Sequence, residues 1–252
     1  MPAKILKGTV QYCLGNKLFF IYVLVQFFIF ECITDVVGGI MKTSSLIVLL
    51  VVLGYGLKVT QDVANGGTRL PKIKLKELIN FGLKGIVVYT FYLTIQGSVL
   101  GLISMKMNFP VFDLEELILE IHETVHLFYQ HDPNTFILFI LLGLITVYVT
   151  VFFMEIALAK LADGGKLKDA FDFRSIKEVI GVIGWNSYAK DYTKIVLSIV
   201  ILMAINIYFI PYAGLNIIIG VVTDILMFVV EYRGIGLIYR EYQEKESEKS
   251  SI

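Results

Sequence analysis

Six apolar segments, each long enough to cross a bilayer as a helix, constrain the fold of this chain more than any other feature. Crossing the roughly 30 Å hydrocarbon layer takes about 20 mainly apolar residues in a helix, and lipid tolerates no unpaired backbone polar group. The segments are approximately Leu18 to Ile40, Thr43 to Asp62, Leu83 to Ile103, Thr135 to Ala159, Tyr192 to Ile210 and Leu215 to Tyr239. We therefore predict an all-α, six-span integral membrane protein.

The amino-acid composition also indicates a membrane protein, and the net charge argues against one class of binding partner. Apolar residues make up 56% of the chain and charged residues 17%, which is typical of a membrane protein rather than of a soluble domain. The formal net charge is 0, and binding to phosphate backbones needs a basic excess, so we expect no nucleic-acid partner. Cys13 and Cys32 lie at different expected depths, which argues against a disulfide between them.

The connections between the segments differ sharply in Lys and Arg. The connection over 58–84 carries six of these residues and that over 160–194 carries seven, whereas the other three hold only Lys42 and Lys106. Cytoplasmic connections are enriched in Lys and Arg. The pattern therefore predicts a multi-pass protein of the cell membrane with both termini in the cytoplasm.

Two connections share a pattern that indicates a repeated unit. "VTQDVANGG" and "LAKLADGG" end the second and fourth segments, and their glycine pairs at 66–67 and 164–165 stand where a helix C-terminus needs positive φ. Each is followed by a basic amphipathic stretch, predicted to lie in the membrane plane, and the N-terminus offers a weaker third copy. The predicted apolar stripes are Leu75, Leu78, Ile79 and Leu83; Phe173, Ile176, Val179, Ile180 and Ile183; and Leu6, Val10 and Cys13.

We predict one membrane domain over 1–240, with repeats at 1–62, 65–160 and 163–240, and a polar, frayed tail over 241–252. The alternative is that any helical hairpin entering from a basic connection acquires such a pattern. Gly97 and Gly101 have the spacing of close helix packing, which we interpret as structural.

The chain resembles an uncharacterised family of multi-pass membrane proteins that is common in methanogenic archaea and is catalogued as a domain of unknown function. Leu-Pro at 70–71, Gly-Leu-Lys at 82–84, "AFDFRSI" at 170–176 and "RGIGLIYREY" near the end carry this resemblance, which covers nearly the whole chain. It implies a helical membrane protein of unestablished role and supplies no catalytic residues.

The stretch "HETVH", His122 to His126, has the H-E-x-x-H pattern of zinc peptidases. Spacing of four places both imidazoles on one helix face to bind zinc, while the glutamate activates the bound water. No third ligand follows at a known spacing, and the stretch lies in a predicted outer amphipathic helix outside the family pattern. We therefore regard His122 and His126 as a weak zinc site, and a membrane metallopeptidase as the alternative function. Otherwise we predict no cofactor.

Polar groups inside the segments are stronger candidates for function, since a charge within the bilayer is costly and usually faces a partner or water. The candidates are Glu31, Asp35, Gln96, Asn206 and Asp224. One interpretation is a polar cluster that binds a proton, cation or solute. The other is that Glu31 and Asp35 reach the outer surface while Asp224 forms an interhelical clamp. Arg233 is expected to pair with Glu231 or Glu155.

No phosphate-binding loop, dinucleotide fingerprint or nucleophile elbow occurs in the sequence. We therefore predict a non-enzymatic role, either in handling a solute or lipid in the membrane or as a membrane scaffold. Membrane lipid is the expected partner, and a small solute, a second copy of the chain or another membrane protein are partners that the sequence leaves open.

Overall fold

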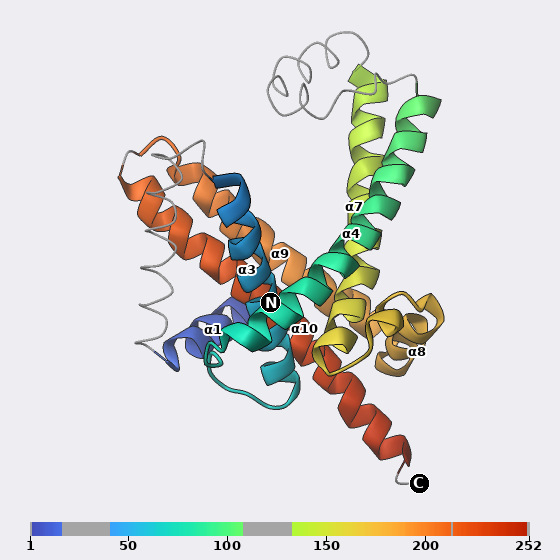
Figure 1. Ribbon diagram of the computed structural model, residues 1–252. Helices are drawn as coiled ribbons and strands as arrows, with labels where there is room; N and C mark the ends of the chain where they lie inside the picture. The colour runs from blue at the N-terminus through green and yellow to red at the C-terminus, as the bar shows by residue number, and fades with distance from the viewer. Residues whose placement is uncertain (1, 17–40, 108–132, 213, 251–252) are drawn as a thin grey trace. The chain divides into compact units, whose positions relative to one another are not determined.

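The computed structural model describes residues 2–16, 41–107, 133–212 and 214–250, and this described part of the chain is helical throughout apart from turns and short connections (Figure 1). The elements are α1 (Pro2–Leu14), α3 (Met41–Ala64), α4 (Leu75–Lys106), α7 (Pro133–Ala162), a 3-10 helix (Leu167–Ala170), α8 (Phe173–Ile183), α9 (Trp185–Phe209) and α10 (Leu215–Ser250). The all-α prediction is confirmed for these residues.

Four of the described helices are long and apolar enough to cross a membrane: α4, α7, α9 and α10. They coincide with the third to sixth predicted spans. The second predicted span coincides with α3, which is not among these four, and the first lies outside the described residues. The structure thus supports a membrane-embedded protein, while the count of six, the repeat and the orientation stay predictions.

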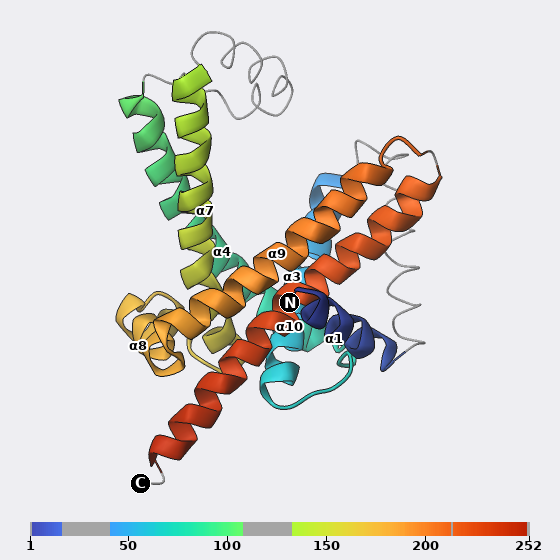
Figure 2. The same cartoon turned by 180° about the vertical axis from the view of Figure 1, so that it is seen from behind.

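The chain divides into two compact units, Met1–Val88 with Glu155–Ile252, and Tyr89–Met154. In the second unit, the later part of α4 and most of α7 run side by side, as both views show (Figures 1 and 2). In the first unit, α10 is the common partner of the other helices, because it packs against α9, α3, α1 and α8.

The first turns of α4 cross α3 with almost no space between the two backbones. A Cβ atom at Gly54 would lie 1.9 Å from the Leu78 carbonyl oxygen, and one at Gly82 would lie 2.0 Å from the Leu50 carbonyl oxygen. Only glycine lets the helices approach this closely. By contrast, a Cβ at Gly97 or Gly101 would meet no described atom within 4 Å, so the close contact predicted there is not seen.

The predicted helix-ending glycines are confirmed. Gly66 and Gly164 have φ of 86° and 93°. The Gly66 N–H donates to the Val63 carbonyl and the Gly67 N–H to the Asp62 carbonyl, at 3.0 and 2.7 Å. Gly164 and Gly165 bond Leu161 and Lys160 in the same way, at 3.3 and 3.0 Å. Both helices therefore end in a Schellman motif, which positions the segment that follows.

Burial follows the predicted stripe in one of the three amphipathic stretches. In α8, Ile176, Val179, Ile180 and Ile183 are buried, and Phe173 is partly exposed. In α4 only Leu78 of the predicted set is buried, while Leu75, Ile79 and Leu83 are exposed. In α1 the buried residues are Thr9, Tyr12 and Cys13, and Val10 is exposed. The exposed apolar residues of the other two stretches are free to face lipid, so their position in the membrane plane stays a prediction.

The polar end of the chain is helical, in contrast to the frayed tail that we predicted. α10 continues to Ser250, and ion pairs one turn apart link Arg240 to Glu244 at 2.8 Å and Lys245 to Glu241 at 2.6 Å. Lys245 also donates to the carbonyl of Ile183 at the end of α8, at 2.8 Å. These contacts stabilise the helical conformation of this charged end of the chain.

We expect Gly54→Ala to destabilise the protein, because the added methyl group must push α3 and α4 apart. Overpacking of this kind costs about 1–3 kcal/mol. Gly97→Ala is the matched control, since its methyl group meets no described atom and alanine is the better helix former. Thermal unfolding midpoints of the two variants in the same detergent check this. Equal midpoints would show that the crossing tolerates a side chain.

Candidate functional site

The structure describes three of the five predicted intramembrane polar residues. Glu31 and Asp35 lie outside the described residues, as do His122 and His126. Gln96 is in the part of α4 that belongs to the second unit. Asn206 and Asp224 are in the first unit, and the structure brings these two together. Convergence of Glu31 with Asp224 therefore stays a prediction.

Asn206 and Asp224 form a polar contact between two neighbouring helices. The Asn206 side-chain amide on α9 donates to a carboxyl oxygen of Asp224 on α10, at 3.3 Å. Asn206 also lies beside Gly220, one turn before Asp224, where a Cβ would be in ordinary van der Waals contact with the Asn206 oxygen at 3.7 Å. Hydrogen bonds of this kind join helices in a membrane, where water is not available to replace them. The geometry suits an interhelical clamp.

A second pair of polar groups lies deeper in the protein. Glu155, near the end of α7, is 1% exposed, and its carboxyl group is adjacent to that of Glu231 on α10. Among the described residues, no N–H or hydroxyl group donates to either Glu155 oxygen. A buried carboxylate ordinarily has such donors or a cation beside it. The hydrogen-bonding neighbour of Glu155 is the Glu231 carboxyl, and a bond between two carboxyl groups requires that one of them carry a proton.

The basic residues nearest in sequence do not supply that partner. Arg233 was expected to pair with Glu231 or Glu155, but its guanidinium lies over the ring of Tyr12 on α1, 5.7 Å from the ring centre. Lys160, one turn after Glu155 on α7, instead donates to the hydroxyl of Ser175. The expected pairing of Arg233 was wrong because its guanidinium projects toward α1, and Lys160 projects toward α8 rather than toward the two acids.

Tyr12, Asp62 and Arg233 form a junction of α1, α3 and α10 that the sequence analysis missed. The buried Tyr12 hydroxyl donates to a carboxyl oxygen of Asp62 at 3.1 Å. Burial, and next the charge of Asp62, raise the pKa of Tyr12, so its hydroxyl stays a donor. Gly8 lets Arg233 approach α1, because a Cβ there would lie 3.1 Å from the guanidinium. The junction anchors the N-terminal helix.

Metal binding has no support in the described part of the chain. It contains no group of three or more His, Cys, Asp and Glu side chains arranged to hold a metal ion. The zinc site predicted at His122 and His126 lies outside this part and stays a prediction.

The chain matches the family model described as "Protein of unknown function (DUF4013)" over residues 37–228. It belongs to the DUF4013 family. No curated protein and no solved structure matches it. The match confirms the expected membership of a family of unknown function, whereas its prevalence in archaea stays a prediction. The matched DUF4013 region includes Glu155, Asn206 and Asp224 and ends before Glu231.

We expect Tyr12→Phe to loosen α1. The change removes the hydrogen bond to the Asp62 carboxylate, and bonds to charged groups contribute about 1.5–3 kcal/mol. Tyr208→Phe is the control, because Tyr208 is 66% exposed on α9. A fall in unfolding midpoint for the first variant alone is the expected result. Equal midpoints would mean that the junction does not hold α1.

The thiol of Cys13 offers a local measurement of the same docking. Burial raises the pKa of Cys13 to about 11, against a smaller lowering by Arg233. Because the thiolate is the reactive form, labelling by a maleimide at neutral pH should be slow in the native Cys32→Ser protein and speed up as pH rises toward that value. Adding Tyr12→Phe should accelerate it. Labelling as fast as in unfolded protein would show that α1 is not docked.

Proposed function

We propose that this protein is a non-enzymatic membrane protein that handles a solute or lipid, and that Glu155 and Glu231 form its binding group for a proton or a cation. The observation that carries the proposal is the buried Glu155 carboxyl, which has no N–H or hydroxyl donor among the described residues and lies within hydrogen-bonding reach of a second carboxyl group, that of Glu231. A solely structural acid in this setting would be expected to have a donor or a cation.

Two adjacent carboxylates repel each other unless a proton or a cation lies between them. Glu155 is itself 1% exposed and is followed by Ile156, Ala157, Leu158 and Ala159, all at most 1% exposed, so its carboxyl group cannot easily turn into water. Loading and unloading of the pair would therefore change the forces between the end of α7 and α10. Such a change can couple an ion to movement of another ligand, which is the general basis of secondary transport.

A membrane scaffold is the second candidate, and the hydrogen bond between Asn206 and Asp224 favours it. In a scaffold the polar residues serve helix packing alone. The two candidates differ in whether the folded protein binds an ion at Glu155. They can therefore be separated without knowledge of the transported molecule.

A ligand that binds only the folded state raises its stability, by about 2.7 kcal/mol at a hundred times its dissociation constant. We expect the unfolding midpoint of the protein in neutral-lipid nanodiscs to rise with one of Na⁺, K⁺, Mg²⁺ and Ca²⁺, or with protons as pH is lowered, at constant ionic strength. Glu155→Gln keeps the shape of the side chain and removes its charge, so it should abolish that response.

Asp224→Asn is the matched control, because it neutralises a carboxyl group that already has a partner and should leave the response intact. The proposal would be contradicted if the unfolding midpoint of the wild type changed with none of these ions and not with pH. It would also be contradicted if the Glu155→Gln variant responded as the wild type does. A loss of stability confined to Asp224→Asn would then favour the scaffold.

A further inference from the structure

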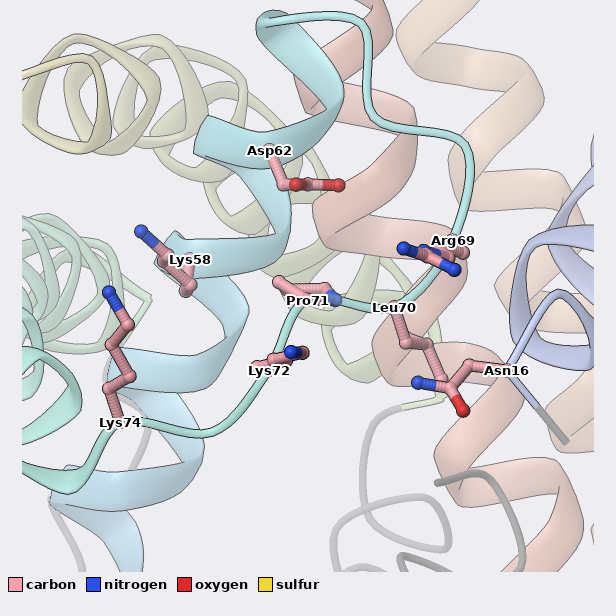
Figure 3. A pocket seen from close by; sticks show the side chains of 8 residues that line it. All are labelled: Asn16, Lys58, Asp62, Arg69, Leu70, Pro71, Lys72 and Lys74. Carbon is pink, nitrogen blue, oxygen red and sulfur yellow. The ribbon is translucent and has the colours of Figure 1, made fainter. Parts of the chain in front are cut away.

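A pocket of about 510 Å³ lies in the first unit, apart from the acidic pair, and has a strongly basic lining (Figure 3). It is formed by Asn16, which follows α1, by the last turns of α3 and by the connection that leads to α4. Its lining residues are Asn16, Lys58, Asp62, Arg69, Leu70, Pro71, Lys72 and Lys74. Four of these are cations and one is a carboxylate. A volume of this size is within the range of small-molecule sites.

The four cations of the pocket differ in whether they form ion pairs with described residues. Lys58 and Lys74 both pair with Glu77, at 3.2 and 3.1 Å. Arg69 and Lys72 are exposed and make no hydrogen bond or ion pair with any described residue. Glu77 therefore offsets part of the charge of the first two, whereas no described acid forms an ion pair with Arg69 or Lys72. These are the cations that an anion entering the pocket would meet.

The connection that carries Arg69 and Lys72 is held in place on both sides. The Schellman motif at Gly66 and Gly67 fixes its start. Between the two cations, Leu70 is 3% exposed and the carbonyl of Pro71 accepts a hydrogen bond from the Tyr55 hydroxyl at 3.2 Å. An anchored backbone reduces the entropy that a ligand must overcome when it orders the side chains. The two cations thus project from a fixed segment.

We propose that this pocket binds the phosphate group of a phosphate-bearing ligand, with Arg69 and Lys72 as its principal contacts. A guanidinium can donate two parallel hydrogen bonds to phosphate oxygens, and an ammonium adds a point charge. Asp62 would repel the phosphate itself, so the phosphate occupies the side of Arg69 and Lys72. Asp62 offers an acceptor to a hydroxyl-bearing group attached to it.

The phosphate can come from a membrane lipid or from a soluble compound. The connection leads directly into α4, one of the helices able to span a membrane, and basic pockets next to such helices bind anionic headgroups. The inference does not depend on the acidic pair. A failure of the Glu155 experiment leaves it standing, and the reverse is also true.

The test uses the full chain in nanodiscs and compares Arg69→Gln/Lys72→Gln with the wild type. One set of nanodiscs contains phosphatidylcholine alone and the other adds phosphatidylglycerol, whose retention by the protein is counted by native mass spectrometry. Glycerol 3-phosphate and inorganic phosphate, titrated calorimetrically, represent the soluble source. We expect the double variant to lose affinity by about tenfold or more, because charge-assisted hydrogen bonds are lost.

Lys166→Gln/Lys168→Gln is the control, since it removes the same charge from exposed residues after the second glycine pair and outside the pocket. Selective phosphatidylglycerol retention lost only in the pocket variant supports a lipid headgroup. Calorimetric binding of glycerol 3-phosphate lost only in that variant supports a soluble phosphate compound. Equal losses in the two variants, or binding of none of the probes by a folded wild type, would overturn the proposal.

Discussion

The contact between α3 and α10 is the interaction on which the arrangement of the first unit depends. The Thr60 hydroxyl on α3 donates to the backbone carbonyl of Tyr232 on α10 at 3.0 Å, and Thr60 is 2% exposed. The ring of Tyr55 stacks on that of Phe228, at 6.4 Å between centres. Because these contacts fix the rotation of both helices, Asp62 and Arg233 come to lie on either side of Tyr12. The same rotation positions Tyr55 to hold the connection at Pro71.

In the first unit, the acidic pair and the two exposed bases lie in different surroundings, and the free-energy cost of burying a charge explains the difference. The acids Glu155 and Glu231 lie within long apolar helices, where a bound proton or cation would be protected from water. Arg69 and Lys72 lie in a connection and are exposed, so water can solvate them in the absence of a ligand. A charge interaction is strongest where water is excluded, because the local dielectric constant is low. A charged group at the surface attracts an oppositely charged ligand from solution and so speeds association. The two sites are therefore suited to different ligands.

The sequence predicted those features that depend on one helix at a time. Apolar length predicted the helices α4, α7, α9 and α10, and the need for positive φ predicted the turns at Gly66 and Gly164. Both signals are local, since a helix in lipid must satisfy its own backbone and a left-handed residue favours glycine. They require no knowledge of a neighbouring helix.

The sequence failed where a partner helix decides the outcome. The close contact between α3 and α4 is made at Gly54 and Gly82, whereas the glycine spacing had indicated close packing at Gly97 and Gly101. Glu231 and Arg233 were paired by depth, yet residues two apart on a helix point to different faces. The structure accordingly places one beside Glu155 and the other over Tyr12. Glu155 stood alone in the apolar stretch "FFMEIALA", which was the signal that could have identified it.

Asp62 links the junction to the basic pocket, and its engagement explains why the pocket keeps its positive character. The carboxylate lines the pocket, but one of its oxygens already accepts the hydroxyl of Tyr12. The other nearby acid, Glu77, is held by Lys58 and Lys74. Neither acid forms an ion pair with Arg69 or Lys72, so these two cations are left for a ligand. The hydrogen bond from Tyr12 on α1 to Asp62 on α3 therefore shapes the charge of a pocket in which α1 contributes no cation of its own.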